Sequence, residues 1–504
     1  MAGQPTLPDS SGPQAAVGLE DARFGLHVET NPPSEILIVS DLHLGRGRDP
    51  YTRRFICTEN FVSDQAFDRW LHASYPEDKK LLILNGDTFD FIRVANCPKT
   101  QDDFANWHAL LARLGVVKTI DELRDSISRK EKRYGLQTDD YKCVWKLLQM
   151  ALGHQEFFRA LAYWIEQSGS LLMLKGNHDL DLYWPLVRKA FCLFLQDQGA
   201  SPSDTDQRVF YCDSWVRINN VYLEHGHRYD PQQAMSDGPT LPDDPTQLNL
   251  PLATFVARYL INQLEELEPF LGCLRPNERI MWIVLHKHPV AGLRMLGRSL
   301  TFLRRALQLT SQRGLFWYLI FLGAVILPFV LFAIFAVLLL VPKVRAWILS
   351  LPPSVSFAVG LLSVLSPYLV AAVRELCNKF SAWREKRRRA RQIGEDDLAK
   401  GVYGNIKGLP FPKANRIYAV MGHTHDPDAQ RLPDINGCKV LYLNTGSWIP
   451  VWPDDRPDLD GQVRLPFVRF RRDSTGEYHH AYCEWRDDRG HPAEPYILAP
   501  PLAD

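Results

Sequence analysis

The sequence MGHTHDPD occupies residues 421–428 of a chain of 504 residues. It continues an apolar run, residues 417–421, that predicts a buried strand, and glycine and proline bound the turn that follows. His423 and His425 stand one residue apart in this turn, so both imidazoles are expected to project from one strand end. A His-x-His pair alone is a weak metal signal, because histidines also cap strands and form hydrogen bonds in cores.

Four earlier apolar runs of strand length end in the same kind of polar group. They are residues 36–40, followed by Asp41 and His43; residues 81–85, followed by Asp87 and Asp90; residues 171–175, followed by Asn177, His178 and Asp179; and residues 221–224, followed by His225 and His227. Five strands that each deliver Asp, His or Asn at the carboxyl end predict one shared site.

The charge balance, apolar content and cysteine pattern of the chain indicate which classes of protein it can belong to. The 58 Lys and Arg balance the 58 Asp and Glu, and this formal net charge of +0 gives no argument for nucleic-acid binding. An apolar content of 46% allows a sizeable core. The 9 cysteines contain no C-x-x-C pair, which indicates reduced thiols in a cytoplasmic setting. Residues 1–34 have neither a basic start nor an apolar stretch and are expected to form a flexible tail.

The order of expected elements favours an α/β fold. From residue 35 the pattern is strand, loop, helix, strand, as in sheets whose strands are buried. Residues 90–176 are largely helical and are expected to cover the sheet rather than to cap the site. Runs 209–218 and 221–224 predict neighbouring strands around an Asn219-Asn220 turn. The last runs alternate as antiparallel strands do, and they are residues 439–444, 464–470 and 478–485.

Residues 228–410 are interpreted as an inserted α-helical membrane hairpin. Residues 315–341 carry no charge over about 27 positions, enough at roughly 1.5 Å each to span the roughly 30 Å hydrocarbon core. Residues 354–373 form a second uncharged run, with a re-entrant or interfacial helix as the alternative. Lys and Arg flank the pair, so the positive-inside rule places the catalytic domain in the cytoplasm. Residues 254–270 are expected to lie along the same membrane surface, and the basic cluster of 384–391 to contact anionic head groups.

The residues at the strand ends form a metal-binding set. They provide two carboxylates, one amide oxygen and four imidazoles, which suits borderline divalent metals. One carboxylate can bridge two ions, and a pair roughly 3.5 to 4 Å apart can hold a hydroxide nucleophile and bind phosphoryl oxygens. The set is Asp41, His43, Asp87, Asn177, His225, His423 and His425.

These blocks, in this order, resemble the calcineurin-like metallophosphoesterases. The family pattern is D-x-H, G-D-x-x-D, G-N-H-D/E, H and G-H-x-H, and the resemblance covers residues 35–227 and 411–490. It implies a sandwich of two β-sheets flanked by helices and two divalent ions, with Mn²⁺ expected and Fe or Zn as alternatives. It also implies that Asp87 bridges the ions, one held by Asp41, His43, Asp87 and His425, the other by Asp87, Asn177, His225 and His423.

The resemblance further implies a proton donor. His178 would lie near the leaving-group oxygen and donate a proton or stabilise phosphate charge, with Asp90 orienting its ring. The motif wording is most similar to UDP-2,3-diacylglucosamine pyrophosphohydrolase-like members, which tend to carry His-Gly-Asp where this chain has His225-Gly226-His227. His227 could support a ligand from behind, contact substrate or only pack.

The function expected from the sequence is that of a membrane-anchored, cytoplasm-facing two-metal phosphoesterase. Its substrate would be a phosphorylated lipid or a lipid-linked nucleotide, its partner a phospholipid membrane, and no nucleic acid is expected. One alternative is a tethered phosphodiesterase or phosphatase for soluble nucleotides or phosphoproteins, and another is a non-catalytic membrane scaffold. The expected organisation is a tail (1–34), a catalytic domain in two parts (35–227 and 411–490), the insertion between them, and a C-terminal tail (491–504).

Overall fold

The computed structural model describes residues 22–74, 79–230, 238–251, 397–411, 414–453, 461–486 and 491–492, with further positions between 233 and 290 and at 342 and 350. The chain divides into two compact units, one of residues 1–292 and 393–504 and the other of residues 293–392. The sheets and the candidate site described below belong to the first unit.

A seven-stranded sheet has the order β16-β15-β14-β1-β2-β3-β4. Its centre is parallel, and its antiparallel part comes from the C-terminal residues of the chain. The strands are β1 (Glu35–Val39), β2 (Lys80–Asn85), β3 (Ser170–Leu174), β4 (Val209–Cys212), β14 (Pro466–Arg472), β15 (Tyr478–Arg486) and β16 (His491–Pro492). The expected antiparallel pairing of the last strands is confirmed for β14 with β15.

A five-stranded sheet has the order β11-β12-β10-β6-β5. Here β6, β10 and β12 are parallel, and β5 and β11 pair antiparallel at the edges. The strands are β5 (Trp215–Ile218), β6 (Val221–Glu224), β10 (Arg416–Met421), β11 (Asp428–Ile435) and β12 (Cys438–Asn444). The expected single strand over 209–218 is therefore two strands in different sheets, because the chain leaves the first sheet at Asp213 and enters the second at Trp215.

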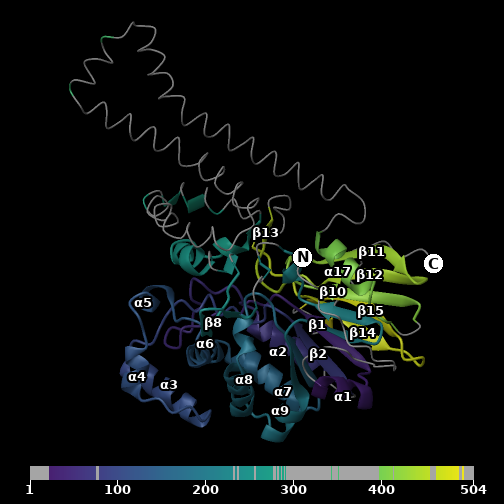
Figure 1. Cartoon of the computed structure of the whole chain (residues 1–504), viewed down its shortest axis with the longest axis horizontal. Coiled ribbons are helices and arrows are strands. Elements are labelled where there is room, and N and C mark those ends of the chain that lie inside the picture. Colours follow the sequence, from purple (N-terminus) through teal and green to yellow (C-terminus); the bar gives the residue numbers. More distant parts are fainter. Residues whose placement is uncertain are drawn as a thin grey trace. The chain divides into compact units, whose positions relative to one another are not determined.

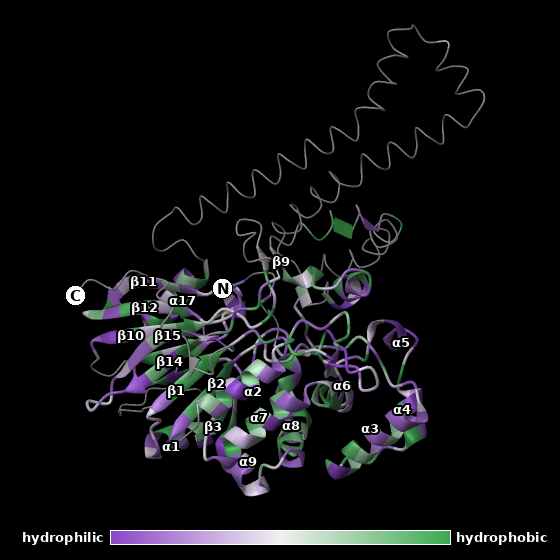
Figure 2. Cartoon of the chain, turned by 180° about the vertical axis from the view of Figure 1, so that it is seen from behind, coloured by the Kyte–Doolittle hydropathy of each residue, from purple (hydrophilic) through white to green (hydrophobic). Residues whose placement is uncertain are grey.

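Alternate residues of each central strand face two different cores. Ile36 and Ile38 of β1 belong to the apolar core shared with the five-stranded sheet. Leu37 and Val39 face the other way, into the core shared with the helices. This period of two explains why β1, β2 and β3 are nearly continuous apolar runs. Both β2 and β3 are coloured hydrophobic along most of their length in Figure 2.

Helices cover the outer face of the seven-stranded sheet (Figure 1). α2 (Asp64–Ala73), α6 (Asp140–Gly153), α7 (Gln155–Glu166) and α8 (Pro185–Asp197) pack there. α3 (Gln101–Arg113) and α4 (Ile120–Asp125) lie farther out, against α6 and each other, and capping boxes begin both helices. The prediction that residues 90–176 supply sheet-covering helices is thus confirmed for α7.

The smaller elements complete the described part of the chain. A helix, α1, lies inside the segment that was predicted to be a flexible tail, and its Phe24 and Val28 enter the core between the sheets. The remaining elements are α1 (Ala22–Thr30), α5 (Glu131–Tyr134), η1 (Leu180–Tyr183), α9 (Pro202–Arg208), η2 (His227–Tyr229), β7 (Thr240–Leu241), β8 (Asp244–Leu248), η3 (Ala257–Ile261), α11 (Asn262–Glu265), η4 (Leu271–Cys273), β9 (Leu274–Arg275), α17 (Asp397–Ile406) and β13 (Trp452–Pro453).

The prediction of an inserted membrane hairpin is wrong, and with it the two-span membrane location and the cytoplasmic side inferred for the catalytic domain. Over the described residues, no helix combines the length and the apolar character needed to cross a bilayer. Both expected spans, 315–341 and 354–373, lie outside the described residues. An uncharged run predicts a span only where it forms one continuous helix of about 20 residues, and a lack of charge does not by itself establish such a helix.

Candidate metal centre

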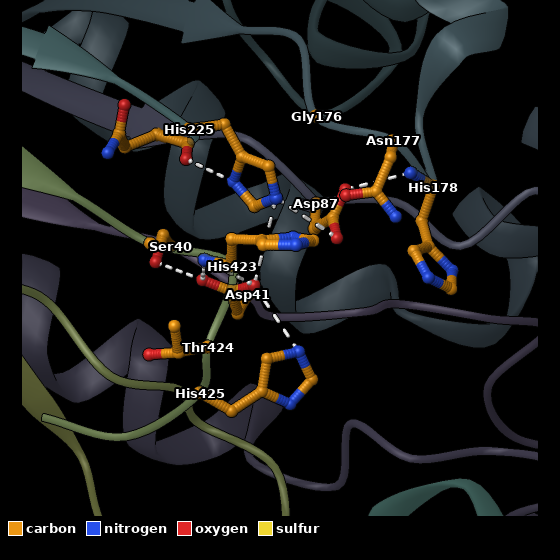
Figure 3. Close-up of polar contacts among 12 residues, drawn as sticks. Ser40, Asp41, Asp87, Gly176, Asn177, His178, His225, His423, Thr424 and His425 are labelled. Atoms are coloured by element: carbon orange, nitrogen blue, oxygen red, sulfur yellow. Dashed lines mark hydrogen bonds and ion pairs between the residues drawn. The ribbon is translucent and has the colours of Figure 1, made fainter. Parts of the chain in front are cut away.

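The carboxyl ends of five strands meet at one site, and they come from both sheets (Figure 3). Within each sheet the contributing strands are parallel, so their carboxyl ends lie at the same edge. The residues are Asp41 and His43 after β1, Asp87 after β2, Asn177 after β3, His225 after β6, and His423 and His425 after β10. All seven ligands predicted from the sequence are thus delivered by the predicted strands.

The loops that carry these residues hold an uncommon backbone conformation. The φ angles of Asp41, His43, Asp87, His423 and His425 are 54°, 51°, 49°, 72° and 63°. Residues with a side chain rarely adopt this left-handed region, and such strain persists where surrounding contacts impose it. Two backbone hydrogen bonds tie the first loop to the second, from the Asp41 amide to the Gly86 carbonyl (3.1 Å) and from the His43 amide to the Asp87 carbonyl (2.9 Å).

Glycines in three of the motifs allow the loops to approach one another. A Cβ atom on Gly86 would overlap the ring of His225, and one on Gly176 would overlap the carboxylate of Asp87. A Cβ atom on Gly422 would overlap the side chain of Asp41. These positions therefore need glycine because a side chain would occupy the space that the ligand side chains use.

One group of side chains consists of Asp41, His43 and His425. Asp41 Oδ1 lies 3.8 Å from His43 Nε2 and 3.4 Å from His425 Nε2. The two Nε2 atoms are 3.0 Å apart. The Ser40 hydroxyl donates to Asp41 from behind, and the backbone amide of His423 lies 3.0 Å from Oδ2 and 3.2 Å from Oδ1 of the same carboxylate. These three side chains can hold a metal ion.

A second group consists of Asp87, His225 and His423, and it too can hold a metal ion. His225 Nε2 lies 3.2 Å from Asp87 Oδ2. The other ring nitrogen, Nδ1, lies 3.0 Å from the carbonyl oxygen of Asn85, a contact that fixes Nε2 toward the site. Asp87 Oδ2 is also 3.7 Å from His43 Nε2, so this carboxylate lies between the two groups. A position between the groups is what a bridging ligand requires.

One buried polar atom at the site fits a bound cation. Asn177 Oδ1 has no hydrogen-bond partner among the described residues, although Asn177 is 1% exposed. Leaving such an atom without a partner is costly, and a divalent ion satisfies an amide oxygen. The donor set of carboxylate, amide and imidazole groups therefore fits the metal that the sequence predicts.

Electrostatic coupling within the site favours charged forms. Burial raises the pKa of the Asp41 carboxyl, but the imidazoles of His225, His43 and His425 outweigh it and bring the pKa to about 2. Burial lowers the pKa of His43, while hydrogen bonds to Asp41 and Asp90 raise it to about 10. The pKa of His225 is likewise raised to about 9 by Asp87 and Asp41 against the effect of burial. Metal ions must displace these protons, so metal binding weakens as the pH falls.

His178 is bound to Asp90 beside the two groups. Its Nδ1 atom lies 3.0 Å from Asp90 Oδ2, and its backbone amide donates to Asp87 Oδ1 at 2.8 Å. Asp90 Oδ2 also lies 3.3 Å from His43 Nδ1. Despite burial, which opposes ionisation, His178 and His43 hold the pKa of Asp90 well below its usual range. The Asp90 carboxylate is therefore charged and orients His178, whose side chain stays partly exposed. His178 also forms a possible metal-binding group with His43 and Asp87.

The structure adds Asp230, which the sequence reasoning did not single out, and it gives contacts to Asp179 and His227, which the sequence named without a settled role. Asp230 Oδ2 lies 3.2 Å from His423 Nε2, and its place in the HGHRYDP block was the available signal. Asp179 accepts hydrogen bonds from the backbone amides of Gly176 (2.5 Å) and Thr88 (2.9 Å), which ties the β2 and β3 loops together. The ring of His227 lies 5.6 Å from that of His225, and burial lowers its pKa, so this histidine is neutral.

Comparison with known proteins gives no assignment. No protein-family profile matches the chain, and no curated protein sequence matches it significantly. The chain has an α/β fold whose strand ends bring together groups of His and Asp that could hold a metal ion.

Proposed function

We propose that this protein is a two-metal phosphoesterase that hydrolyses a phosphoric ester or anhydride. The observation that supports this best is the convergence of the Asp41 and Asp87 carboxylates with four imidazoles from both sheets, next to His178 bound to Asp90. A site that only stores metal has no need of a partly exposed histidine held by a buried carboxylate. The resemblance of the motifs to calcineurin-like metallophosphoesterases points the same way.

The residues would hold two ions in two overlapping sets. Asp41, His43 and His425 would hold one ion, and Asn177, His225 and His423 the other, with Asp87 shared by both. When bound, such ions act as Lewis acids toward phosphoryl oxygens and make water nucleophilic at neutral pH. Mn²⁺ is the ion we expect, with Fe or Zn as alternatives.

Two protein side chains, His178 and Asp90, carry out proton transfer to the leaving group. His178 donates Nδ1–H to Asp90, which leaves Nε2 to carry a proton toward the leaving-group oxygen. Asp90 remains ionised, so it stabilises the protonated imidazole. The P–O bond to the leaving group breaks as an oxygen of water bonds to phosphorus, and His178 protonates the oxygen that departs, so the products are the protonated leaving group and the phosphate.

For the substrate we propose a phosphorylated lipid or a lipid-linked nucleotide, because the motif wording is most similar to enzymes that cleave a nucleotide diphospholipid. Soluble nucleotides and phosphoproteins form the second candidate class, and a binding role without catalysis the third. The discriminating experiment is an activity screen of the purified protein with Mn²⁺ against lipid phosphates, nucleotide diphospholipids and bis-para-nitrophenyl phosphate. A protein that binds metal and hydrolyses none of these compounds would support the binding role.

Asp87→Asn tests the proposal directly. Removal of the shared charge affects both ions at once, so metal content and hydrolysis of bis-para-nitrophenyl phosphate should both be lost. Metal content is measured by mass spectrometry of the purified protein and turnover by release of nitrophenolate. Asp102→Asn, an exposed change on α3, is the matched control and should retain both. Two bound ions with near wild-type turnover in Asp87→Asn would refute the proposal.

A further inference from the structure

One polar face of a helical segment is buried against the catalytic half of the protein. The segment lies between the ligands His225 and His423 in sequence and includes the π-helical turn η3 and α11. Thr254, Arg258, Asn262 and Glu265 are spaced by four, four and three residues, so they lie on one helix face. Their exposed fractions are 0%, 7%, 2% and 0%. The expectation that residues 254–270 lie along a membrane surface is thus wrong for these four side chains.

Three of these side chains donate to backbone carbonyls outside the segment, two of them in or near the loops of the candidate metal centre. The Thr254 hydroxyl donates to the carbonyl of the predicted ligand Asn177 at 3.4 Å. Arg258 donates to the carbonyls of Gly135 and Leu136 at 2.8 and 2.6 Å. The side-chain amide of Asn262 donates to the carbonyl of Ile92 at 2.6 Å, two residues from Asp90. Because buried polar groups are costly without partners, these contacts fix the segment in one position.

The fourth side chain, Glu265, begins a chain of buried charges that ends at His178. Its carboxylate forms an ion pair with the guanidinium of Arg93 and accepts the backbone amide of Gly272 at 2.7 Å. Arg93 Nε lies 3.5 Å from Asp90 Oδ2, the atom that accepts the Nδ1 proton of His178. Glu265, Arg93 and Asp90 are 0%, 6% and 0% exposed, so their charges are little screened by water.

We propose that Glu265 is a positioning residue for His178 and that it acts through Arg93 and Asp90; this inference rests on the function proposed above. Arg93 faces carboxylates on two sides, and Glu265 draws the guanidinium away from Asp90. Without Glu265 the buried cation pairs with Asp90 alone and competes with the imidazole for the same oxygen, Oδ2. Loss of that hydrogen bond frees the His178 ring to turn away from the leaving-group oxygen.

Glu265→Gln tests the inference, with Glu266→Gln as the matched control, because Glu266 is exposed on the same segment. We expect kcat for phenyl ester substrates to fall about 10-fold, at the low end of the 10- to 100-fold typical of groups that orient a ligand from behind. KM and metal content should stay unchanged. The loss should be larger for phenol as leaving group, whose pKa resembles that of tyrosine at about 10, than for 4-nitrophenol, which departs with less need of a proton. An equal loss with both leaving groups would overturn the inference.

A double-mutant cycle separates positioning from general damage to the fold. In the His178→Ala background, Glu265→Gln should lower kcat no further, because its effect passes through the missing imidazole. The same loss in both backgrounds would overturn the inference. Should Glu265→Gln fail to fold, the paired variant Arg93→Met with Glu265→Leu removes both buried charges, and it should retain the His178-dependent rate. A paired variant with the activity of His178→Ala would also contradict the proposal.

A readout without turnover distinguishes failure of this inference from failure of the proposed function. In the Mn²⁺-free protein, the Nδ1 proton of His178 in its bond to Asp90 is observable as a downfield proton NMR signal, assigned by its absence in His178→Ala. Glu265→Gln should shift or broaden this signal, and Glu266→Gln should leave it unchanged. An unchanged signal in Glu265→Gln overturns the inference even if no ester is hydrolysed. If Glu265→Gln shifts the signal but the wild-type protein hydrolyses no ester, the positioning role is supported and only the phosphoesterase proposal is refuted.

Discussion

His178 differs from the predicted ligands because its imidazole is held by a carboxylate on one side and remains partly exposed on the other. This arrangement suits proton donation, but the same ring lies in a group with His43 and Asp87 that can hold metal. The two roles differ in what the side chain contributes. A proton donor changes the rate, whereas a ligand changes the metal content.

His178→Ala should therefore retain its metal and lose turnover. General acid catalysis typically contributes about 10² to 10⁴ in rate, so kcat for an ester with a poor leaving group should fall by that factor. Metal content is measured on the same preparation. His72→Ala, a change at an exposed histidine of α2, is the control. A collapse of metal content, with activity in proportion to the remaining metal, would make His178 a ligand.

His154 gives a pH-dependent term in stability. It is buried between Asp64 and Glu59, at 2.8 and 3.3 Å, and these carboxylates raise its pKa to about 10 although burial lowers it. Below pH 6.5 the imidazole is protonated in folded and unfolded chains, so its contribution to stability is complete. Between pH 6.5 and about 10 only the folded state keeps the proton, and the contribution falls with rising pH.

The expected slope is about 1.4 kcal/mol of unfolding free energy per pH unit over that window. Urea unfolding of the wild type and His154→Gln at several pH values between 6 and 10 measures it, both with metal bound. The difference in stability between them should shrink as the pH rises. A difference that is constant across the window would show that His154 is neutral in the folded protein.

At the level of single residues, the motif positions were predictable because each follows a short apolar run that can only be a buried strand. Asp41 and His225 were found in this way without any knowledge of the fold. Glu265 and Asn262 were not predictable, since a helix with one polar face looks the same whether water or protein covers it. Only the structure shows that this face is buried against Ile92 and Arg93.

Among the elements, the short helix α1 contributes to the core, although it lies in a segment that was predicted to be a flexible tail. Phe24 is 4% exposed and packs against Phe210, whereas Leu26 on the same helix is 62% exposed. Phe24→Ala should lower the unfolding free energy by about 3 kcal/mol, as large-to-small changes in cores do. Leu26→Ala should change it by less than about 0.5 kcal/mol. Equal effects in urea unfolding would mean that α1 does not pack as described.

Element boundaries were harder to predict than element types. Residues 209–218 read as one apolar strand, yet the chain changes sheets at Asp213, because apolar content does not say which sheet a strand joins. Strand β11 was missed, since its sequence DAQRLPDI has a proline and no regular alternation. The long apolar runs after residue 314 were interpreted from composition alone, and the prediction of a membrane hairpin derived from them failed.

For the whole molecule, the candidate metal site joins the two sheets. Asp41 and Asp87 come from one sheet, and His225 and His423 from the other. Ions bound to the folded state alone stabilise it by about 2.7 kcal/mol for each site at a free concentration of 100 times Kd. Treatment with EDTA should therefore lower the Tm of the Mn²⁺-loaded protein in calorimetry. Asp87→Asn should show a much smaller drop, and equal drops would place the stabilising metal elsewhere.

Two neighbouring strands of the five-stranded sheet, β6 and β10, are synthesised at well separated times because they are far apart in the sequence. Val221 of β6 pairs with Tyr418 of β10, and at 5 to 20 residues per second the second strand appears about 10 to 40 s after the first. Throughout that interval β6 has an open edge toward the missing β10, which is a target for chaperones and for wrong pairing between nascent chains. His423 and His425 arrive with β10, the strand that pairs with β6, so the last of the predicted ligands appear only when that open edge can be covered. Uptake of metal by a nascent chain would thus report that its synthesis has passed residue 425.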